Sequence, residues 1–497
     1  MAGAVLMLLV LLSLSCTLSA YSYTPCTDNA ECREAFGLGS VCGDQQLCTA
    51  MTSEPRCANT YPEDLLERPE EYPDVIVMGS LFNHDPEQGD LVETQAARLA
   101  VKQANDSEGL DGRSFAIVEC GYEEDSELDA LTMEEATVQT LLWMVDSLGI
   151  TAVIGPATSG MMEAAWYGIA ERADAPILIS PSATSPALTT IDGDVKGPAN
   201  PGLVWRTAPP DSLQGEALSI DITRSLGDAD QSVAILYQIG PYGEGLADEF
   251  ISNYADTTHT VDRWLFENDT QRDNAVNEVA NLATPPQAIL FISSDVSDVV
   301  KFMYAAGSRV ESFLGIPIYL ADAARDQELL TQTESESWAA ELLPQVRGTA
   351  PAVPEGDVYE SFAAAYTTTF QGQSADDSSY SAYSYDAAWL AIYGTAWSLA
   401  ANGSITGLGI AGGLHQISDP DYTPELEIKP LNWGTVRTKF AASTAINVVG
   451  ASGHLDYDDA DEETTAPIDI WQVQDVDGLP LEAPHTWGFV TVDRIEP

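Results

Sequence analysis

The segment ILISPSATSPALTT, residues Ile177–Thr190, begins as a short apolar run and continues as a series of hydroxyl side chains interrupted by Pro181 and Pro186. Ser, Thr and Pro are typical of turns, so the simplest interpretation is a loop that follows a buried strand. The other interpretation is the wall of a ligand pocket, because such a pocket needs a few well-placed polar groups. The rest of the chain helps to decide between the two.

Short apolar runs alternate with helical patterns on both sides of this segment. The runs predict strands at 74–80, 115–120, 150–155 and 176–180, then at 232–237, 287–292 and 316–321. Apolar residues at helical spacing separate them. A helical region follows at 359–402, and strands return near 467–473 and 487–492. This alternation predicts an α/β fold in which helices cover parallel sheets, and the two series suggest two lobes.

Small polar clusters follow five of the expected strands. They are ATSG at 157–160, SPSAT at 180–184, GPYGEG at 240–245, SSD at 293–295 and ADA at 321–323. In open α/β sheets, ligands bind outside the carboxyl ends of the strands. Turn chemistry explains each cluster alone, but their common position favours the pocket.

The charge of the chain limits its partners. Its 497 residues include 77 acidic and 20 basic side chains, for a net charge of −57. Such a surface repels phosphate backbones, so nucleic acid is not expected as a partner. A hydrophobic content of 45% is too high for a disordered acidic chain, so we expect a folded protein with a solvated acidic surface.

No motif of an enzyme, cofactor site or metal site meets its structural context. The five histidines lack ligand spacing and no G-x-S-x-G occurs. GLGIAG at 407–412 has the letters of a nucleotide-binding loop but follows an expected helix, not a strand. DYDDADEE at 456–463 lacks the glycine of a calcium loop and is expected to be a solvated turn. The prediction is a protein that is not an enzyme and has no cofactor or metal.

The N-terminus predicts export. The apolar run at 4–12 is too short to span a bilayer and is typical of a signal peptide, assigned to 1–15. Cys16 closes the run as in a bacterial lipoprotein signal, and ordinary cleavage near Ala20 is the alternative. No later segment is apolar enough to cross a membrane. We expect a protein of the periplasm or cell surface, held to the membrane only through a lipid on Cys16.

A cysteine-rich module and a Pro- and Glu-rich linker are expected over 16–73. The spacing of Cys26, Cys32, Cys42 and Cys48 is not that of a zinc site. After an export signal it predicts two disulfides, with three possible pairings. Cys57 and Cys120 are candidates for a pairing across the fold.

Several motifs in order resemble the type I periplasmic binding proteins, in the leucine/isoleucine/valine-binding, receptor-ligand-binding-region branch. They are GPATSG, PILISPSATSPALT, VWRTAPPDSLQGEAL, SVAILYQIGPYGEGLADEF, YDAAWLAIYGTAWS and the late GASGHLDYDDADEETTAPIDIWQV. The resemblance runs from about residue 74 to the C-terminus. It implies two lobes that close on a ligand and are joined by three hinge crossings. The first lobe would comprise 74–206 plus 354–446, and the second 207–353 plus 447–497.

The resemblance also implies a ligand site. The first lobe would hold a ligand carboxylate through Ser159 and through the loop Ser182, Ala183 and Thr184. A helix N-terminus beside Ser159 suits an anion, although Ser is also common as a helix cap. In the second lobe, Tyr242 would cover the ligand, Asp322 would pair with its ammonium, and Asp295 would lie in a third contact loop. A packed tyrosine and helix-capping aspartates are the structural alternatives.

These groups suit an amino acid, and no Arg or Lys lies among the matched positions to hold a phosphate. The leading hypothesis is an extracytoplasmic solute-binding protein that delivers a small ligand, an amino acid, to an ABC permease. The alternative is a surface lipoprotein that senses or recruits a partner with the same lobes and does not import. The cysteine-rich module favours this alternative slightly.

Overall fold

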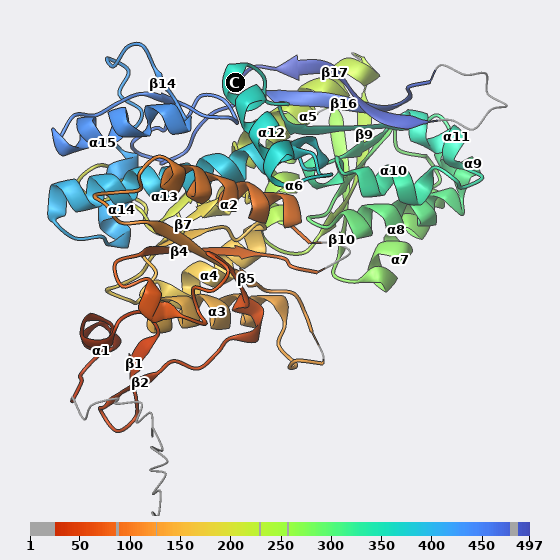
Figure 1. Cartoon of the computed structure of the whole chain (residues 1–497). Helices are drawn as coiled ribbons and strands as arrows, with labels where there is room; N and C mark the ends of the chain where they lie inside the picture. The colour runs from red at the N-terminus through yellow and green to blue at the C-terminus, as the bar shows by residue number, and fades with distance from the viewer. Residues whose placement is uncertain (1–24, 86–88, 126, 228–229, 256–257, 478–485) are drawn as a thin grey trace, which may run out of the picture.

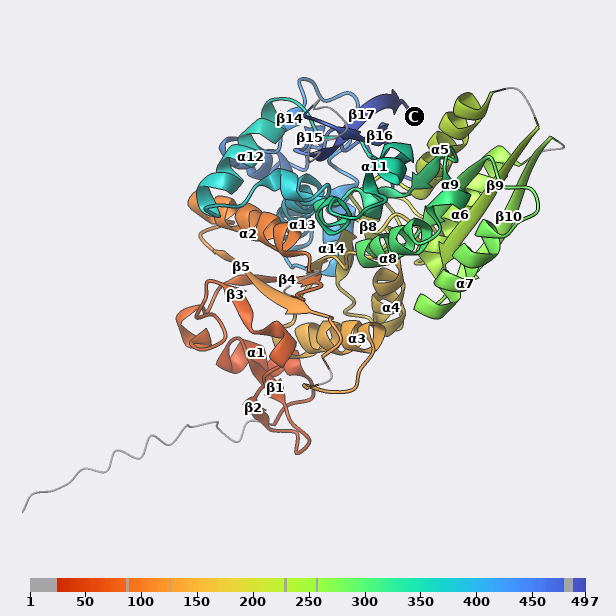
Figure 2. The ribbon, with the colours of Figure 1, turned by 90° about the vertical axis from the view of Figure 1, so that its right-hand side faces the viewer.

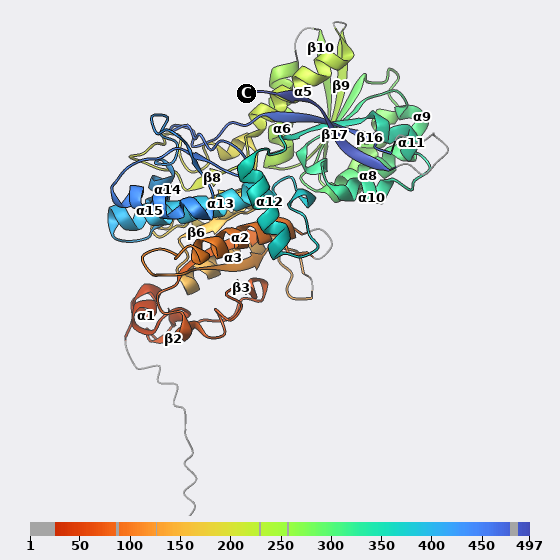
Figure 3. The same cartoon turned by 45° about the horizontal axis from the view of Figure 1, so that its top comes forward.

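The computed structural model describes residues 25–85, 89–125, 127–227, 230–255, 258–477 and 486–497. Within these residues the chain forms two large sheets, each covered by helices on both faces, which lie side by side (Figure 3). The expected α/β fold is confirmed. The signal segment 1–15, Cys16 and the alternative cleavage near Ala20 lie outside the described residues.

The first sheet has the strand order β3-β5-β4-β6-β7-β8 within the described residues. All its pairs are parallel except β3 with β5. Its strands are β3 (Asn59–Tyr61), β4 (Ile76–Phe82), β5 (Phe115–Gly121), β6 (Ala152–Ile154), β7 (Ile177–Ser180) and β8 (Val204–Arg206). Strands β4 to β7 coincide with expected ones. Strand β3 lies in the segment expected to be a linker, which therefore adds an edge to this sheet.

The second sheet has the order β10-β9-β11-β12-β13-β16-β17 within the described residues. Pairs from β10 to β13 are parallel, and β16 and β17 form an antiparallel end. The strands are β9 (Gln231–Gln238), β10 (His259–Phe266), β11 (Ala288–Ile292), β12 (Ile318–Leu320), β13 (Val346–Pro351), β16 (Ile468–Asp475) and β17 (Trp487–Ile495). The sequence analysis missed β10 and β13. Strand β10 is a largely exposed edge, and β13 carries Arg, Gly and Pro, so neither reads as a continuous apolar run.

Helices from distant parts of the chain cover the first sheet. Figures 1 and 2 show α2 and α13 on one face, with α12 beside them, and α3 and α4 on the other face. The helices of this lobe are α2 (Leu91–Asp106), α3 (Met133–Trp143), α4 (Ser159–Ile169), α12 (Asp357–Thr369), α13 (Ser381–Asn402), α14 (Gly407–Leu414) and α15 (Trp433–Ala441). Helix α13 is buried along most of its length, as its apolar sequence suggests.

The second sheet separates two apolar clusters, one on each face. Helices α5 (Asp211–Leu226) and α6 (Pro241–Tyr254) pack on one face. The other face carries α7 (Asp269–Ala280), α8 (Val296–Gly307), α9 (Val310–Phe313), α10 (Gln327–Thr333) and α11 (Ala339–Leu342). Within the described residues, no helix combines the length and apolar character needed to cross a membrane.

The chain passes between the sheets three times, after β8, after β13 and before β16. The first two crossings lie near the expected positions. The third lies later than the expected 446/447 boundary. Strand β15 (Val448–Val449) still pairs with β14 (Leu426–Glu427), and Ala451 and Leu455 pack in the core of the first lobe.

The acidic segment 456–463 is largely the exposed turn expected from its sequence, with Asp456, Asp458, Asp459 and Asp461 exposed, but its last two acids are held by the first lobe. Glu462 is 1% exposed, and its carboxylate accepts hydrogen bonds from the backbone N–H of Gly202 and contacts the ring of His415 at 2.8 Å. Glu463 pairs with Arg206 at the end of β8. These partners lie far away in sequence, so the pattern alone could not reveal them.

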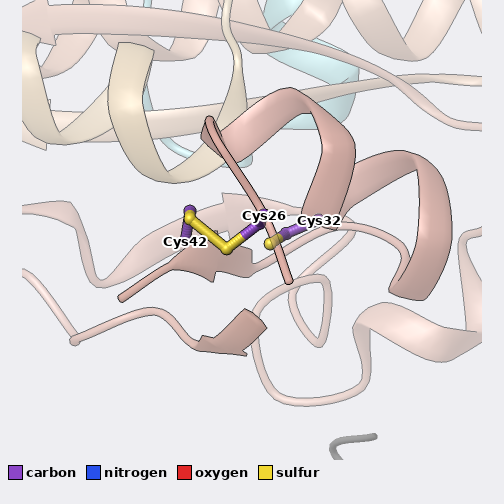
Figure 4. A group of neighbouring side chains, drawn as sticks. All are labelled: Cys26, Cys32 and Cys42. Carbon is purple, nitrogen blue, oxygen red and sulfur yellow. A yellow bond between two sulfur atoms is a disulfide. The ribbon is translucent and has the colours of Figure 1, made fainter. Parts of the chain in front are cut away.

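The cysteine-rich module contains α1 (Asn29–Phe36), β1 (Ser40–Cys42) and β2 (Cys48–Ala50). A disulfide joins Cys26 to Cys42 (Figure 4), and another joins Cys32 to Cys48. This confirms the prediction of two disulfides and selects one of the three pairings. A third disulfide joins Cys57 to Cys120 in β5, as the sequence suggested.

The module is fastened to the first lobe. Asn29 Nδ2 and Arg33 Nη1 both donate to the carbonyl oxygen of Asp146, at 2.9 and 2.7 Å. Gly149, with φ of +68°, gives the Arg33 side chain room, because a Cβ there would lie 2.7 Å from Nη2. Figures 1 and 3 place the module at the end of the molecule away from the second sheet.

Candidate ligand-binding site

The loop after β6 begins with a sharp turn at Gly155. Its φ is +97°, and a Cβ would lie 2.4 Å from the carbonyl oxygen of Leu81. Thr158, not Ser159, caps α4, because the Thr158 hydroxyl accepts from the N–H of Met161 at 3.3 Å. The buried Ser159 hydroxyl accepts from the N–H of Ser185 at 3.1 Å. Ser159 thus joins two strand-end loops.

The loop after β7 is built largely by its own hydroxyls. Ser180 Oγ donates to the carbonyl oxygen of Pro156 at 2.6 Å and accepts from the N–H of Ala183 at 2.9 Å. Ser182 Oγ donates to the carbonyl oxygen of Ala157 at 2.8 Å. Thr184 differs from them, because its buried hydroxyl interacts with the carboxyl of Asp211 and not with its own loop. Thr184 therefore lies beside a buried acid, and its ligand contact stays a prediction.

Tyr242 and Asp322 come together in the second lobe. Tyr242 lies at the start of α6, and its hydroxyl donates to Asp322 Oδ1. Asp322 is 4% exposed and begins a short 3₁₀ turn after β12, where it makes no capping hydrogen bond. Gln214 Nε2, from α5, donates to the same carboxylate at 2.9 Å. Asp322 is therefore not a helix cap.

The first lobe reaches this carboxylate through Tyr380, just before α13. Its hydroxyl donates to Asp322 Oδ2. A second hydrogen bond between the lobes runs from Ser185 Oγ to the carbonyl oxygen of Pro241, at 2.6 Å. The described structure is therefore closed over Asp322. Sequence reasoning missed Tyr380, although the tyrosine-rich run at 380–385 is an available signal.

A second buried acid lies beside Asp322. Asp211, the first residue of α5, is fully buried, and its Oδ1 accepts from Gln214 Nε2 at 2.7 Å. The Thr184 hydroxyl also bonds to this carboxyl. Burial and the negative charge of Asp322 raise the pKa of Asp211 well above its usual range. The hinge residue Arg206 opposes this shift, but its guanidinium is engaged by the carbonyl oxygen of Ser185 at 2.8 Å and by Glu463.

Asp295 does not join this group. Its carboxylate caps α8, accepting from the N–H of Ser297 at 2.8 Å and from the Ser297 hydroxyl at 2.9 Å. The structural alternative, a helix cap, describes this residue.

A further acidic pair lies at the start of α2, in the first lobe. Glu93 is 8% exposed and accepts from Ser378 Oγ, while Asp90 accepts from the N–H of Asn83 at 2.9 Å. Burial raises the pKa of both carboxyls, and the charge of Asp90 raises the pKa of Glu93 further. The charge of Asp326, from the second lobe, makes a smaller contribution to the raised pKa of Glu93.

Two groups of side chains have metal-ligand proximity within the described residues. One consists of Cys26, Cys32 and Cys42, whose sulfurs are in disulfides (Figure 4). The other is an outer cluster of Glu425, His454 and Asp456, with His454 and Asp456 exposed.

Two α/β lobes that close over a buried carboxylate define a bilobal ligand-binding protein. Residues 92–476 match the family described as the receptor family ligand binding region, and the chain belongs to this family. The expected resemblance to type I periplasmic binding proteins is confirmed.

Relatives and solved structures agree with this assignment. The chain is 26% identical over 387 residues to the chemotactic signal transduction system substrate-binding protein BasB of Halobacterium salinarum, covering 77% of this chain and 82% of that protein. The leucine-binding protein LivK of Thermotoga maritima matches with a TM-score of 0.59 at 15% identity, over 85% of this chain and 99% of that one. LivJ of Streptococcus pneumoniae, solved with isoleucine, matches with a TM-score of 0.56 at 20% identity, over 83% and 100%. At these identities the structures show the shared fold.

Proposed function

We propose that this chain is an extracytoplasmic solute-binding protein that captures an amino acid between its two lobes. The observation that carries the proposal is the Asp322 carboxylate. It is buried where the lobes meet, and the groups that donate to it are the neutral side chains of Gln214, Tyr242 and Tyr380. An ammonium would make stronger, charge-assisted hydrogen bonds to this carboxylate than these donors do.

The ligand carboxylate is assigned to the first lobe. Ser159, Ser182, Ala183 and Thr184 surround the start of α4, where free backbone N–H groups and the helix dipole favour an anion. The buried Thr184 hydroxyl, which also interacts with the Asp211 carboxyl, belongs to this proposed contact. Tyr242 would cover the ligand from the second lobe. Asp295 would act only indirectly, by holding the start of α8.

We assign 59–206 plus 352–457 to the first lobe and 207–351 plus 464–497 to the second, with the acidic segment 458–463 at the hinge. A ligand that touches both lobes binds the closed form better, and so shifts the population toward closure.

Two uses of the captured ligand are candidates. The first is delivery to an ABC permease, and the leucine-binding relatives of the same fold favour it. The second is sensing, favoured by the chemotactic signal transduction protein that matches over most of both chains. Disruption of the gene separates them. Loss of uptake of the labelled ligand supports import, whereas loss of taxis with normal uptake supports sensing.

Export and lipid attachment at Cys16 belong to the same proposal. Disulfides in the described residues suit an oxidising compartment outside the cytoplasm. A mature N-terminus at Tyr21 would refute lipid attachment.

Isothermal calorimetry against amino acids, sugars and amides tests the capture of an amino acid. Native mass spectrometry of the purified protein provides an independent test by identifying a co-purified ligand. Binding of a sugar, with no heat from any amino acid, would overturn the ligand class.

A further inference from the structure

Outside the proposed ligand site, Glu425, His454 and Asp456 come together in the first lobe. Glu425 directly precedes β14, and the other two residues lie in the segment after β15. Nδ1 of His454 lies 3.2 Å from Oε1 of Glu425, and one possible ligand atom from each side chain lies within 4.8 Å of the other two. Glu425 and His454 are 29 residues apart in sequence, so a search for local ligand spacing, which predicted no metal, does not find the group.

The backbone that carries the group is held from both sides. Ser418 Oγ donates to the carbonyl oxygen of Leu455 at 2.8 Å and accepts from the N–H of Tyr457 at 3.0 Å, which fixes the chain around the aspartate between them. The buried carboxylate of Asp386, on α13, accepts from the N–H groups of residues 451–452 at 2.9 and 2.7 Å. The turn before the histidine is therefore anchored in the core of the first lobe. Such support positions side chains for a bound ion in advance.

A buried amide adjoins the group. Asn447 is 8% exposed, and its Nδ2 donates to Oε1 of Glu425 at 3.3 Å. Its Oδ1 has no hydrogen-bond partner among the described residues, whereas buried polar atoms normally have one. The nitrogen and oxygen of an amide exchange places when the amide turns over. Oδ1 of Asn447 then faces the carboxylate of Glu425, which is favourable when a cation lies between the two oxygens.

We propose that Glu425, His454 and Asp456 bind a divalent transition-metal ion, such as Zn²⁺ or Mn²⁺, with Asn447 as a fourth ligand. One imidazole nitrogen with two carboxylates favours these ions over Mg²⁺ and Ca²⁺, which prefer oxygen ligands alone. Ligand atoms bound to Zn²⁺ lie roughly 3.5 Å apart, so small side-chain rotations close the group. His454 and Asp456 are exposed and have room to rotate.

The bound ion joins β14 to the segment that leads into the hinge residues 458–463. Because the ligands are brought together only in the folded chain, the ion stabilises the folded state. Saturating Zn²⁺ should therefore raise the midpoint of thermal unfolding of the full chain.

Isothermal calorimetry with Zn²⁺ at high salt tests the site, because salt screens the diffuse attraction of cations to a chain with a net charge of −57. We expect saturable binding of Zn²⁺ and no saturable heat from Mg²⁺. His454→Gln and Asp456→Asn should each weaken Zn²⁺ binding by more than about 10-fold, the lower bound for losing even an outer-shell partner of a metal. Both variants should also lose the Zn²⁺-dependent rise in the unfolding midpoint. Unfolding without metal checks that they fold.

Asp421→Asn is the matched control, because Asp421 is exposed a few residues before Glu425 and its replacement removes the same charge as Asp456→Asn. It should leave Zn²⁺ binding unchanged. Zn²⁺ binding that survives both His454→Gln and Asp456→Asn, or that Asp421→Asn weakens equally, overturns the assignment to these residues. The absence of saturable binding of both Zn²⁺ and Mn²⁺ overturns the inference, and amino-acid capture stands in either case.

Discussion

Replacement of Asp322 by Asn tests the centre of the site. The substitution keeps the shape of the side chain and removes the negative charge that the ligand ammonium is proposed to meet. Breaking a buried, hydrogen-bonded charge pair costs about 2–5 kcal/mol of binding free energy. Asp322 is 4% exposed, which favours a large loss. Its neutral donors already stabilise the carboxylate, and an ammonium must replace at least one of them, which reduces the loss.

We therefore expect the lower half of that range, about 2–3 kcal/mol, which corresponds to a roughly 30- to 150-fold higher Kd. The fold should tolerate the change, because Asn Oδ1 still accepts from Tyr242 and Gln214, and the Tyr380 hydroxyl can accept from the new amide. Calorimetry at fixed salt gives the Kd, and thermal unfolding checks the fold.

Asp295→Asn is the control, because Asp295 also follows a strand of the second sheet but caps a helix. Asn preserves that cap, so ligand affinity should not change. An Asp322→Asn protein that folds normally and binds the amine with unchanged affinity would refute the role of Asp322.

Three further predictions concern closure and stability. Tyr380→Phe removes a hydroxyl that holds the lobes together at Asp322, so the ligand-free protein should open, with a larger radius of gyration by small-angle scattering; an unchanged radius would contradict this role. The double substitution Cys57→Ala and Cys120→Ala removes a disulfide between residues 63 positions apart. Denaturant titration should show a free energy of unfolding lower by roughly 4 kcal/mol, because the unfolded chain gains entropy. A loss below about 1 kcal/mol would contradict this loop-entropy argument. Burial lowers the pKa of His415, but hydrogen bonds and charges from Glu462 and Asp459 outweigh burial and raise the pKa above 6.5. The protonated ring therefore stabilises the fold below pH 6.5, and this stabilisation is lost as the pH rises through the higher pKa of the folded state. His415→Gln should flatten that loss in pH-dependent unfolding, whereas the exposed His454→Gln should not; equal curves for both variants would show that His415 is not responsible.

Sequence patterning predicted most of the strands that are buried on both faces, but it missed β8 and β13. Strands β9 and β11 are apolar runs bounded by polar residues, so their burial is visible in the letters. Strand β10 is a mostly exposed edge and β3 is a three-residue edge, and neither is distinguishable from a loop by its pattern. The position of the third crossing between the lobes was not predicted either, because it depends on the lobe in which residues 448–457 pack.

Residues of the candidate site could be named from the sequence only where a single loop motif contains them. Tyr242 and Asp322 were named from their loops, and the structure joins them by a hydrogen bond. Asp211 and Gln214 lie in a matched motif, but their chemistry depends on Asp322, which is 108 residues from Gln214. Tyr380 completes the group from the other lobe. Such contacts arise from tertiary packing, which local spacing does not encode.

The contact between Tyr380 and Asp322 also bears on selectivity. The Tyr380 hydroxyl donates to one oxygen of the carboxylate that the ligand is proposed to use. A sugar hydroxyl that replaced it would exchange one neutral hydrogen bond for another and gain little. An ammonium would exchange a neutral hydrogen bond for a charge-assisted one, which is roughly twice as strong. Tyr380 therefore favours cationic amines over neutral solutes, because a neutral ligand gains little by replacing its hydrogen bond. The donors to Asp322 among the described residues are neutral, so an ammonium gains the most from the exchange.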